Sequence, residues 1–228
     1  MGKKRARTNL RGADVEVLQI VALQSGEPSR IRRVLDPRSP IRPAIVPHVI
    51  PLLCDRAVAT AAMQALQRVA DQHPGALIDA LLDPSRAPAV RRRLARALSA
   101  CRSQQVADGL LLIAEDPSPE LRAQCARSLL RIRRQRAEVK LNAERVFDLV
   151  GAELTHPAPD LRHVFTLLSL VLPVRPLRAA YRGLRGNDPH ARGTAMEYLH
   201  GILPKDIRIA LFGRLDVPSG LQPDDQEN

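Results

Sequence analysis

Aromatic residues are scarce in this chain. It has no tryptophan, two tyrosines and three phenylalanines among 228 residues. Proteins that hold single-stranded nucleic acid usually stack its bases on aromatic rings, and enzymes that flip a base enclose it in a pocket of similar side chains. The composition therefore argues against both of these modes of binding.

Cysteine is also rare, and the cysteines lie far apart. Cys54, Cys101 and Cys125 are separated by 47 and 24 residues, so the chain has no CxxC motif and no framework of paired disulfides. Each cysteine lies in an apolar stretch that we expect to be helical, where a free thiol acts as a small hydrophobic side chain. This usage predicts a reducing compartment.

No apolar run is long enough to cross a membrane. The longest run, 164–172, is interrupted by Thr166 and Ser169 and is about half of the ~20 residues that a spanning helix needs. Near the start of the chain, Glu16 and Gln19 interrupt the stretch where a signal peptide would have its apolar core. These features predict a soluble, cytoplasmic protein without direct membrane insertion.

The sequence lacks the local motifs of common catalytic and cofactor sites. It has no HExxH zinc motif, no GxSxG nucleophile motif and no glycine-rich phosphate loop. Glu144, Asp148 and Glu153 share one expected helix and are interpreted as its solvated face rather than as acid-base catalysts. The histidines are scattered and are interpreted as surface or turn residues: His48, His73, His156, His163, His190 and His200. We therefore predict no catalytic residue, no metal site, no cofactor and no enzymatic activity.

Positive charge, by contrast, is abundant. The formal net charge is +11 and the sequence pI is about 10.8, which is typical of proteins that bind nucleic acid, an anionic membrane surface or another acidic partner. Only Lys3, Lys4, Lys140 and Lys205 are lysines, so the rest of the 35 basic residues are arginines. A GC-rich coding sequence would produce the same bias without any selection for binding, and the sequence leaves both explanations open.

Apolar residues recur at helical spacing along most of the chain. Leu121, Cys125, Leu129 and Ile132 form one such stripe, and no segment sustains the two-residue alternation of a strand. The pattern predicts an all-α protein with helices over 13–24, 27–35, 43–53, 56–70, 74–82, 87–100, 103–115, 118–135, 141–155, 158–172, 174–185, 189–202 and 204–214. Two stretches fit this pattern poorly. The prolines within 43–51 predict a helix that is kinked or partly extended. The stretch 131–140 predicts either a longer connection or a helix that continues past its expected end.

A short phrase recurs along the chain, in which a turn with proline is followed by an arginine that opens an apolar helix. Consecutive turns lie 33, 40 and 32 residues apart, and this spacing is typical of stacked helix-pair repeats. We expect each aspartate to accept a hydrogen bond at a helix start, with the proline behind it in the first turn. The copies are Asp83-Pro84 before Val90-Arg91, Asp116-Pro117 before Leu121-Arg122, His156-Pro157 before Leu161-Arg162 and Asp188-Pro189 before Ala191-Arg192.

This spacing predicts how the chain is divided. We expect an α-solenoid of about five or six helix pairs over residues 13–215. Residues 1–12 are basic and without period, and 216–228 are rich in proline, glycine and aspartate, so both ends are predicted to be disordered.

The segment 116–122, Asp-Pro-Ser-Pro-Glu-Leu-Arg, resembles the turn of the HEAT repeats, which are stacked helix pairs with a similar Asp-Pro turn and Val-Arg or Leu-Arg after it. His156 departs from that pattern. The resemblance implies a structural ladder of turn aspartates and helix arginines, made here of Asp83, Arg91, Asp116, Arg122, Arg162, Asp188 and Arg192. The segments 79–84, 90–93, 163–170 and 192–199 also resemble the HEAT-containing cytoplasmic C-terminal region of bacterial nucleotide-transporter-like membrane proteins.

Arginines on two expected second helices are the candidate partner-binding residues. They project away from the apolar stripes, and stacking would bring the two rows together: Arg92, Arg93 and Arg96 on 87–100, then Arg127, Arg131 and Arg134 on 118–135. An ordinary solvated face explains them equally well. The first hypothesis is a non-catalytic scaffold that binds a protein with an acidic surface. The second is a nucleic-acid binder, such as an enzyme similar to the HEAT-type alkyl-base glycosylases. The third, which the resemblance implies, is a soluble regulatory domain that belongs to a transporter-like membrane protein, and it includes a possible association with such a protein.

Overall fold

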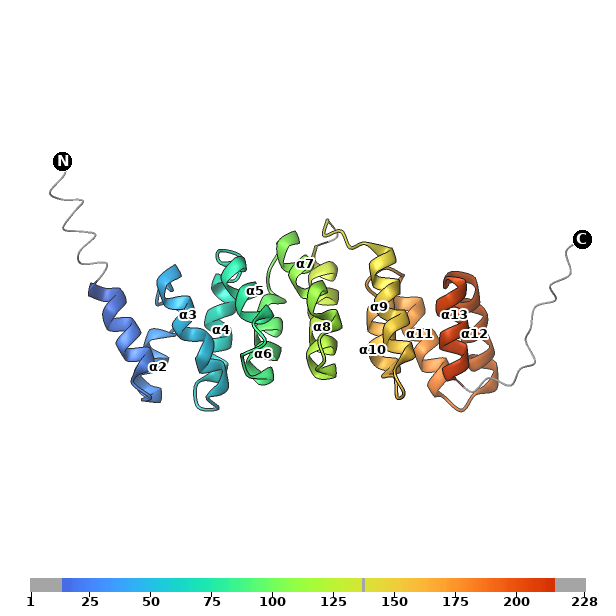
Figure 1. The fold of residues 1–228 in the computed structure, drawn as a ribbon, viewed down its shortest axis with the longest axis horizontal. Helices are drawn as coiled ribbons and strands as arrows, with labels where there is room; N and C mark the ends of the chain where they lie inside the picture. The colour runs from blue at the N-terminus through green and yellow to red at the C-terminus, as the bar shows by residue number, and fades with distance from the viewer. Residues whose placement is uncertain (1–13, 137, 216–228) are drawn as a thin grey trace, which may run out of the picture. The chain divides into compact units, whose positions relative to one another are not determined.

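Every regular element in the computed structural model is a helix (Figure 1). The structure describes residues 14–136 and 138–215, and no strand occurs in this part of the chain. The all-α prediction is therefore confirmed. The predicted disordered ends, 1–12 and 216–228, lie outside the described residues. The chain divides into two compact units, Met1–Lys140 and Leu141–Asn228, and each is described by itself.

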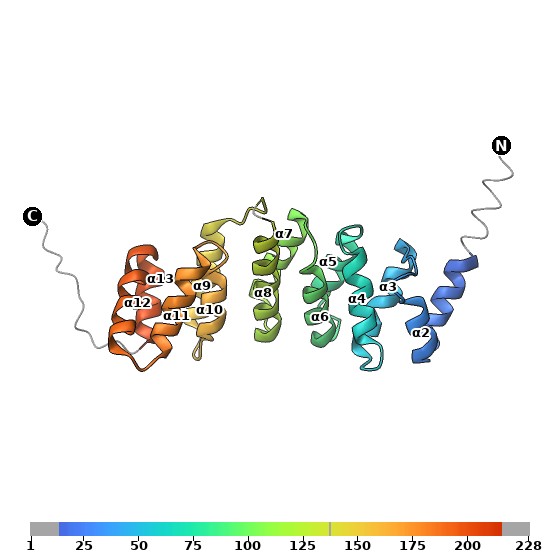
Figure 2. The same cartoon turned by 180° about the vertical axis from the view of Figure 1, so that it is seen from behind.

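Unit 1 begins with a helix over residues 14–24. Its other elements are α2 (Pro28–Val34), the 3₁₀ turn η1 (Pro43–Ile45), α3 (Val46–Val49), η2 (Ile50–Cys54), α4 (Ala59–Val69), α5 (Pro74–Leu82), α6 (Pro88–Leu98), α7 (Gln104–Leu112), η3 (Ile113–Glu115) and α8 (Pro119–Gln135). The helices α4, α6 and α8 contact one another in chain order, and α5 and α7 pack against α6 and α8 (Figures 1 and 2). The unit thus has one row made of α4, α6 and α8 and a second row that contains α5 and α7.

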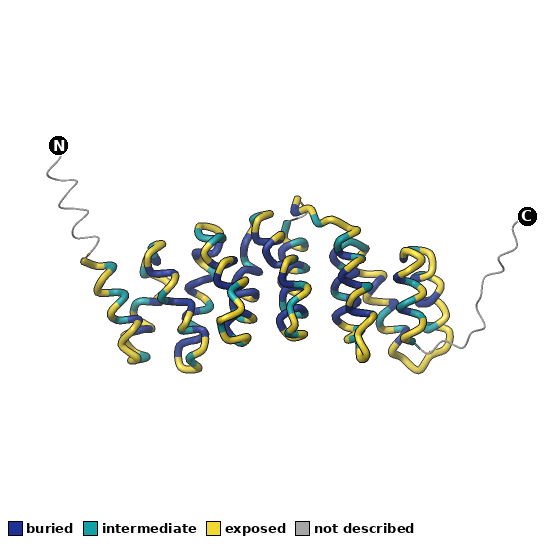
Figure 3. Tube along the Cα trace, in the orientation of Figure 1, coloured by how far each residue is buried: buried dark blue, intermediate teal, exposed yellow. Residues whose placement is uncertain are grey.

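The core of unit 1 lies between these rows. Buried and exposed positions alternate along each helix (Figure 3), as the periodicity predicts. Leu81 on α5, Leu94 and Leu98 on α6, and Leu121 on α8 are each 0% exposed. Burial of a leucine side chain of this kind stabilises a fold by roughly 1.5–3 kcal/mol relative to leaving it in water.

The proline-rich stretch 43–51 is helical throughout, although its helix type changes. The elements η1, α3 and η2 follow one another directly, and a proline lies in the first turn of each. Proline has no amide hydrogen to donate, and in a first turn that donor has no intrahelical partner in any case. Of the two predicted alternatives, a kinked helix or a partly extended one, the partly extended segment is therefore wrong.

The turn aspartates do not all cap helices as predicted. Asp188 accepts the amide hydrogen of His190 and precedes Pro189 at the start of α12. However, α6 and α8 begin later, at Pro88 and Pro119. There the aspartates close a local turn instead, by accepting the amide hydrogens of the serines two residues further on: Asp83 from Ser85 at 3.0 Å and Asp116 from Ser118 at 2.9 Å.

Unit 2 contains α9 (Ala143–Thr155), α10 (Leu161–Leu168), α11 (Val174–Arg185), α12 (Pro189–Ile202) and α13 (Lys205–Arg214). The helix α9 packs against α10 and α13, and α11 packs against α10 and most extensively against α12. Because α8 ends at Gln135 and α9 begins at Ala143, the basic stretch 131–140 ends in a longer connection rather than in an overrun helix.

Candidate interaction surface

Five of the six predicted binding arginines are exposed on two helices that lie against each other. The helices α6 and α8 are direct neighbours (Figure 1). The helical spacing of the exposed arginines places them opposite the buried stripes, and we call this set the α6–α8 arginine face: Arg92 and Arg96 on α6, and Arg127, Arg131 and Arg134 on α8.

Arg93 has a different environment from the other five. Its side chain is half-buried, and its Nη1 donates a hydrogen bond to the backbone carbonyl of Leu53 at the end of η2. This contact links α6 to η2, which lies 40 residues earlier in the chain. Arg93 therefore has a structural contact that its sequence position, directly after Arg92, did not indicate.

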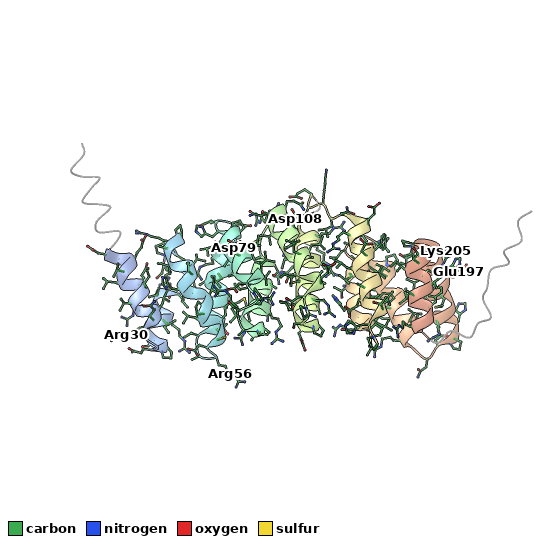
Figure 4. The ribbon with its side chains drawn as sticks, viewed as in Figure 1. Arg30, Arg56, Asp79, Asp108, Glu197 and Lys205 are labelled. Carbon is green, nitrogen blue, oxygen red and sulfur yellow. The ribbon has the colours of Figure 1, made fainter. Side chains whose placement is uncertain are left out.

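The two rows of unit 1 differ in charge. The row α4, α6 and α8 carries one, four and five arginines respectively, whereas its sole acidic residue is Glu120. In the other row, α5 and α7 have no lysine or arginine, and they carry Asp79 and Asp108 at exposed positions (Figure 4). The exposed arginines of the first row still outnumber its acidic residue: Arg68, Arg92, Arg96, Arg127, Arg131 and Arg134.

Glu120 lies at the N-terminal end of α8, on the same face. Hydrogen bonds from its own backbone amide and from the Ser118 hydroxyl lower its pKa, and the guanidinium groups of Arg92 and Arg122 lower it further. The carboxylate is therefore ionised at neutral pH, although it is outnumbered by the arginines around it.

Arg91 and Asp116 form a buried ion pair. The Nη2 of Arg91 lies 2.7 Å from Oδ2 of Asp116, and the two side chains are only 8% and 11% exposed. The Nε of Arg91 also donates to the carbonyl of Leu81, at 2.8 Å. One guanidinium thus joins the end of α5, the body of α6 and the turn before α8.

The other predicted ladder residues make varied local contacts. Arg122 Nη1 donates to the carbonyl of Asp116 at 2.9 Å, and Arg192 Nη1 donates to the carbonyl of Leu184 at 3.2 Å. Arg162 is exposed, and its backbone amide donates to Asp160 Oδ1 at the start of α10. Asp83 pairs with the half-buried Arg86 at 3.1 Å, and its hydrogen bonds with Ser85, together with nearby arginines, lower its pKa. Asp188 caps α12.

Two residues that were predicted to face solvent are buried instead. Glu153 on α9 is 8% exposed and His163 on α10 is 4% exposed, and 3.8 Å separates Oε2 of Glu153 from Nε2 of His163. Glu144 and Asp148 do lie on the exposed side of α9, as predicted. The position of Glu153 three residues after Val150 and four after Leu149 is a signal that could have indicated its burial.

The three cysteines differ in exposure. Cys54 is exposed at the end of η2, so it does not act as the small hydrophobic side chain that we expected, whereas Cys101 and Cys125 are buried. Burial, assisted by the Asp71 carboxylate, raises the pKa of the Cys101 thiol to about 12. Burial, assisted by Asp116, likewise raises the pKa of Cys125 to about 12.

We expect Cys54 alone to react rapidly with Ellman's reagent in the folded protein. At a pH near 8, a thiol with a pKa of about 12 is a thiolate in only about one part in 10⁴, and burial also blocks the reagent. In denaturant, all three thiols should react. The Cys54→Ser variant should lose the fast phase, and rapid reaction of Cys101 or Cys125 in the folded chain would contradict the assignment.

The described residues show neither a metal cluster nor a membrane-spanning element. Among them, no group of three or more His, Cys, Asp or Glu side chains is placed to hold a metal ion. No helix in the same residues combines the length and the apolar character needed to span a membrane. Comparison of the chain with protein-family models and with curated proteins gives no match.

Proposed function

We propose that this chain is a non-catalytic α-solenoid of HEAT-like helix pairs, and that it binds a protein partner with an acidic surface through the α6–α8 arginine face. The observation that carries the proposal is the one-sided charge of α4, α6 and α8, where Glu120 is the only acidic residue. A solvated face formed without selection for binding would ordinarily mix both signs.

Contacts between successive helices support the solenoid part of this proposal. In a repeat stack, each helix pair contacts its neighbours and the core is continuous. The order of contacts α4–α6–α8 fits such a stack. The Arg91–Asp116 ion pair, which joins α6 to the turn before α8, also fits the ladder that the HEAT resemblance implies.

The chemistry of arginine favours carboxylates as the ligand groups. A guanidinium presents a planar fork of donors that matches a carboxylate in bidentate fashion. Exposed ion pairs each contribute only about 0.2–1 kcal/mol. Five such pairs therefore speed association and favour an acidic partner over other partners. The affinity depends on how well the partner's shape fits the face.

Nucleic acid is the second candidate ligand, because the phosphate groups of its backbone accept hydrogen bonds from the same guanidinium groups. The net charge of +11 favours it, and duplex DNA requires no stacking on aromatic rings. Binding of this kind weakens steeply with salt, with a slope that reports the number of phosphates engaged. The salt dependence of binding therefore distinguishes a nucleic-acid ligand from a protein ligand.

The test is to change the α6–α8 arginine face to glutamate (Arg92, Arg96, Arg127, Arg131 and Arg134 together) and to compare captured partners with those of the unaltered chain. We expect the glutamate variant to capture at least tenfold less of the partner, because each substituted position would repel an acidic group that the arginine attracts. A matched variant changes five exposed cations elsewhere in unit 1: Arg33, Arg38, Arg56, Arg102 and Lys140. It should keep the partner.

Two outcomes of this experiment would contradict the proposal. If both five-site variants retain the partner equally, the face is an ordinary solvated surface. If nuclease treatment removes the captured material, and labelled duplex DNA binds the unaltered chain with a steep salt dependence that the face variant loses, the ligand is nucleic acid. Circular dichroism of both variants checks that the helices remain folded.

A further inference from the structure

A groove of about 550 Å³ lies between α11 and α12 in unit 2. Pro176, Ala179 and Gly183 line its α11 side, and Thr194 and Tyr198 line its α12 side. Tyr198 is half-buried, and burial raises the pKa of its hydroxyl. The surface is therefore hollowed and largely apolar, and it suits an extended segment of small and medium side chains.

Arginines follow one edge of this groove. Arg175, Arg178 and Arg182 are spaced by three and four residues, so they form one exposed stripe beside the groove, and Arg182 also lines it. Among the described residues, none of these three side chains forms an ion pair or a hydrogen bond, and α11 has no acidic residue. The fourth arginine of the helix, Arg185, is engaged by Tyr181, whose Oη lies 3.0 Å from its Nη1.

The last described residue, Leu215, is held beside the end of α11. A single guanidinium makes this connection, because Arg192 donates to the carbonyl of Leu184 at 3.2 Å and to the carbonyl of Leu215 at 2.8 Å. Leu215, to which residues 216–228 are joined, therefore lies near the end of the groove lined by Gly186. When fully extended it spans about 45 Å, whereas α11 is only about 18 Å long.

The charge of that segment is opposite to the charge of the groove edge. Residues 216–228 contain no lysine or arginine, and their acidic residues are Asp216, Asp224, Asp225 and Glu227. Three of these four acidic residues are close together in the sequence. The three arginines of the α11 stripe are likewise only three and four residues apart. The length of the segment, its starting point and its charge all point to the same surface.

We propose that residues 216–228 bind in the α11–α12 groove of their own chain, with Asp224, Asp225 and Glu227 paired with Arg175, Arg178 and Arg182. Each exposed ion pair is weak. However, a short tether gives the segment an effective concentration in the mM range, which raises the fraction of chains in which the weak pairs are formed. The bound segment covers the arginine stripe of unit 2 and excludes other acidic ligands from it. This inference concerns a different surface from the α6–α8 arginine face and does not depend on its function.

The test uses the full chain with a spin label in the segment. The variant Cys54→Ser/Gln226→Cys carries the label, and ¹³C-methyl alanine signals of Ala179 and Ala195, which line the groove, report on proximity. We expect several-fold broadening of both signals. Ala97 and Ala107, which are buried in unit 1, serve as references for an intact fold.

Charge variants then decide whether the contact is specific. The changes Asp224→Lys, Asp225→Lys and Glu227→Lys should remove the broadening, and so should Arg175→Glu, Arg178→Glu and Arg182→Glu. The combination of all six changes should restore it, because the ion pairs re-form with reversed signs. The matched variant Arg92→Glu/Arg96→Glu/Arg131→Glu should leave the broadening unchanged.

Other results would overturn the proposal. Broadening that is the same in every charge variant would mean that the segment passes the groove only because it is tethered nearby. In a mixture of ¹³C-labelled chains without spin label and spin-labelled chains without ¹³C, broadening would mean that the segment binds a second copy instead. If the two chains do not affect each other in the mixture, the contact lies within one chain.

Discussion

The Asp116→Ala variant should lose about 3–5 kcal/mol in its free energy of unfolding, measured by urea denaturation. The substitution leaves the Arg91 guanidinium, which is 8% exposed, without the carboxylate that lies 2.7 Å away. A charge left unpaired in the interior costs far more than the pair itself contributes. The turn before α8 also loses the acceptor for the Ser118 amide.

Two controls show whether this loss comes from the unpaired charge. Asp83 occupies the same place in the repeated phrase, but the side chains of Asp83 and its partner Arg86 are 35% and 34% exposed, so Asp83→Ala should have a much smaller effect. In the double variant Arg91→Met/Asp116→Leu neither charge remains. We expect it to be considerably more stable than the sum of the single changes predicts, with a coupling energy of about 1–3 kcal/mol. Additive effects would contradict the proposed cause.

Helix positions were the most predictable part of this structure, because the burial of apolar stripes determines them. The predicted segment 87–100 is α6, Pro88–Leu98, and 189–202 is α12, Pro189–Ile202. The segment 158–172 was predicted too long. The observed helix, α10, ends at Leu168, after which the amide of Leu170 bonds back to the carbonyl of Leu167 in a tight turn. Periodicity continues through such a turn and so does not reveal it.

The repeated phrase was a less reliable guide to local contacts than to helix order. Its aspartates at 83 and 116 close turns rather than cap helices, because a second proline, at 88 or 119, begins the next helix. The phrase also does not separate Arg91, which is buried, from Arg92, which is exposed, although the two are adjacent. Which of them faces inward depends on the phase of the helix relative to its neighbours.

Within the candidate surface, the sequence predicted the charge better than the environment of each side chain. Arg92 and Arg96 share an exposed face, as helical spacing indicates, whereas Arg93 reaches a carbonyl of η2. That contact depends on how α6 packs against an element 40 residues earlier in the chain. Spacing within one helix carries no information about it. A continuous solenoid over 13–215 likewise remains a prediction, and the two units meet in sequence where the 40-residue interval between turns falls.

The Gly183→Ala variant should be less stable by up to about 2 kcal/mol, since α11 and α12 approach each other too closely for a side chain at this position. A Cβ on residue 183 would lie 2.6 Å from the carbonyl oxygen of Ala191 and 3.2 Å from the Cβ of Ala195. The first of these neighbours is backbone and cannot rotate away, so one helix must shift. Overpacking of this kind costs about 1–3 kcal/mol, and the better helix propensity of alanine offsets only about 1 kcal/mol of it.

Gly193 provides the matched control on the facing helix. It is exposed in the interior of α12, and a Cβ there would meet nothing within 4 Å. Gly193→Ala should therefore gain up to about 1 kcal/mol from helix propensity alone. Opposite signs for the two glycines in urea denaturation would attribute the loss at Gly183 to the close approach of α11 and α12. A stabilising effect at Gly183 would show instead that these helices separate readily, and that the groove between them is not rigid.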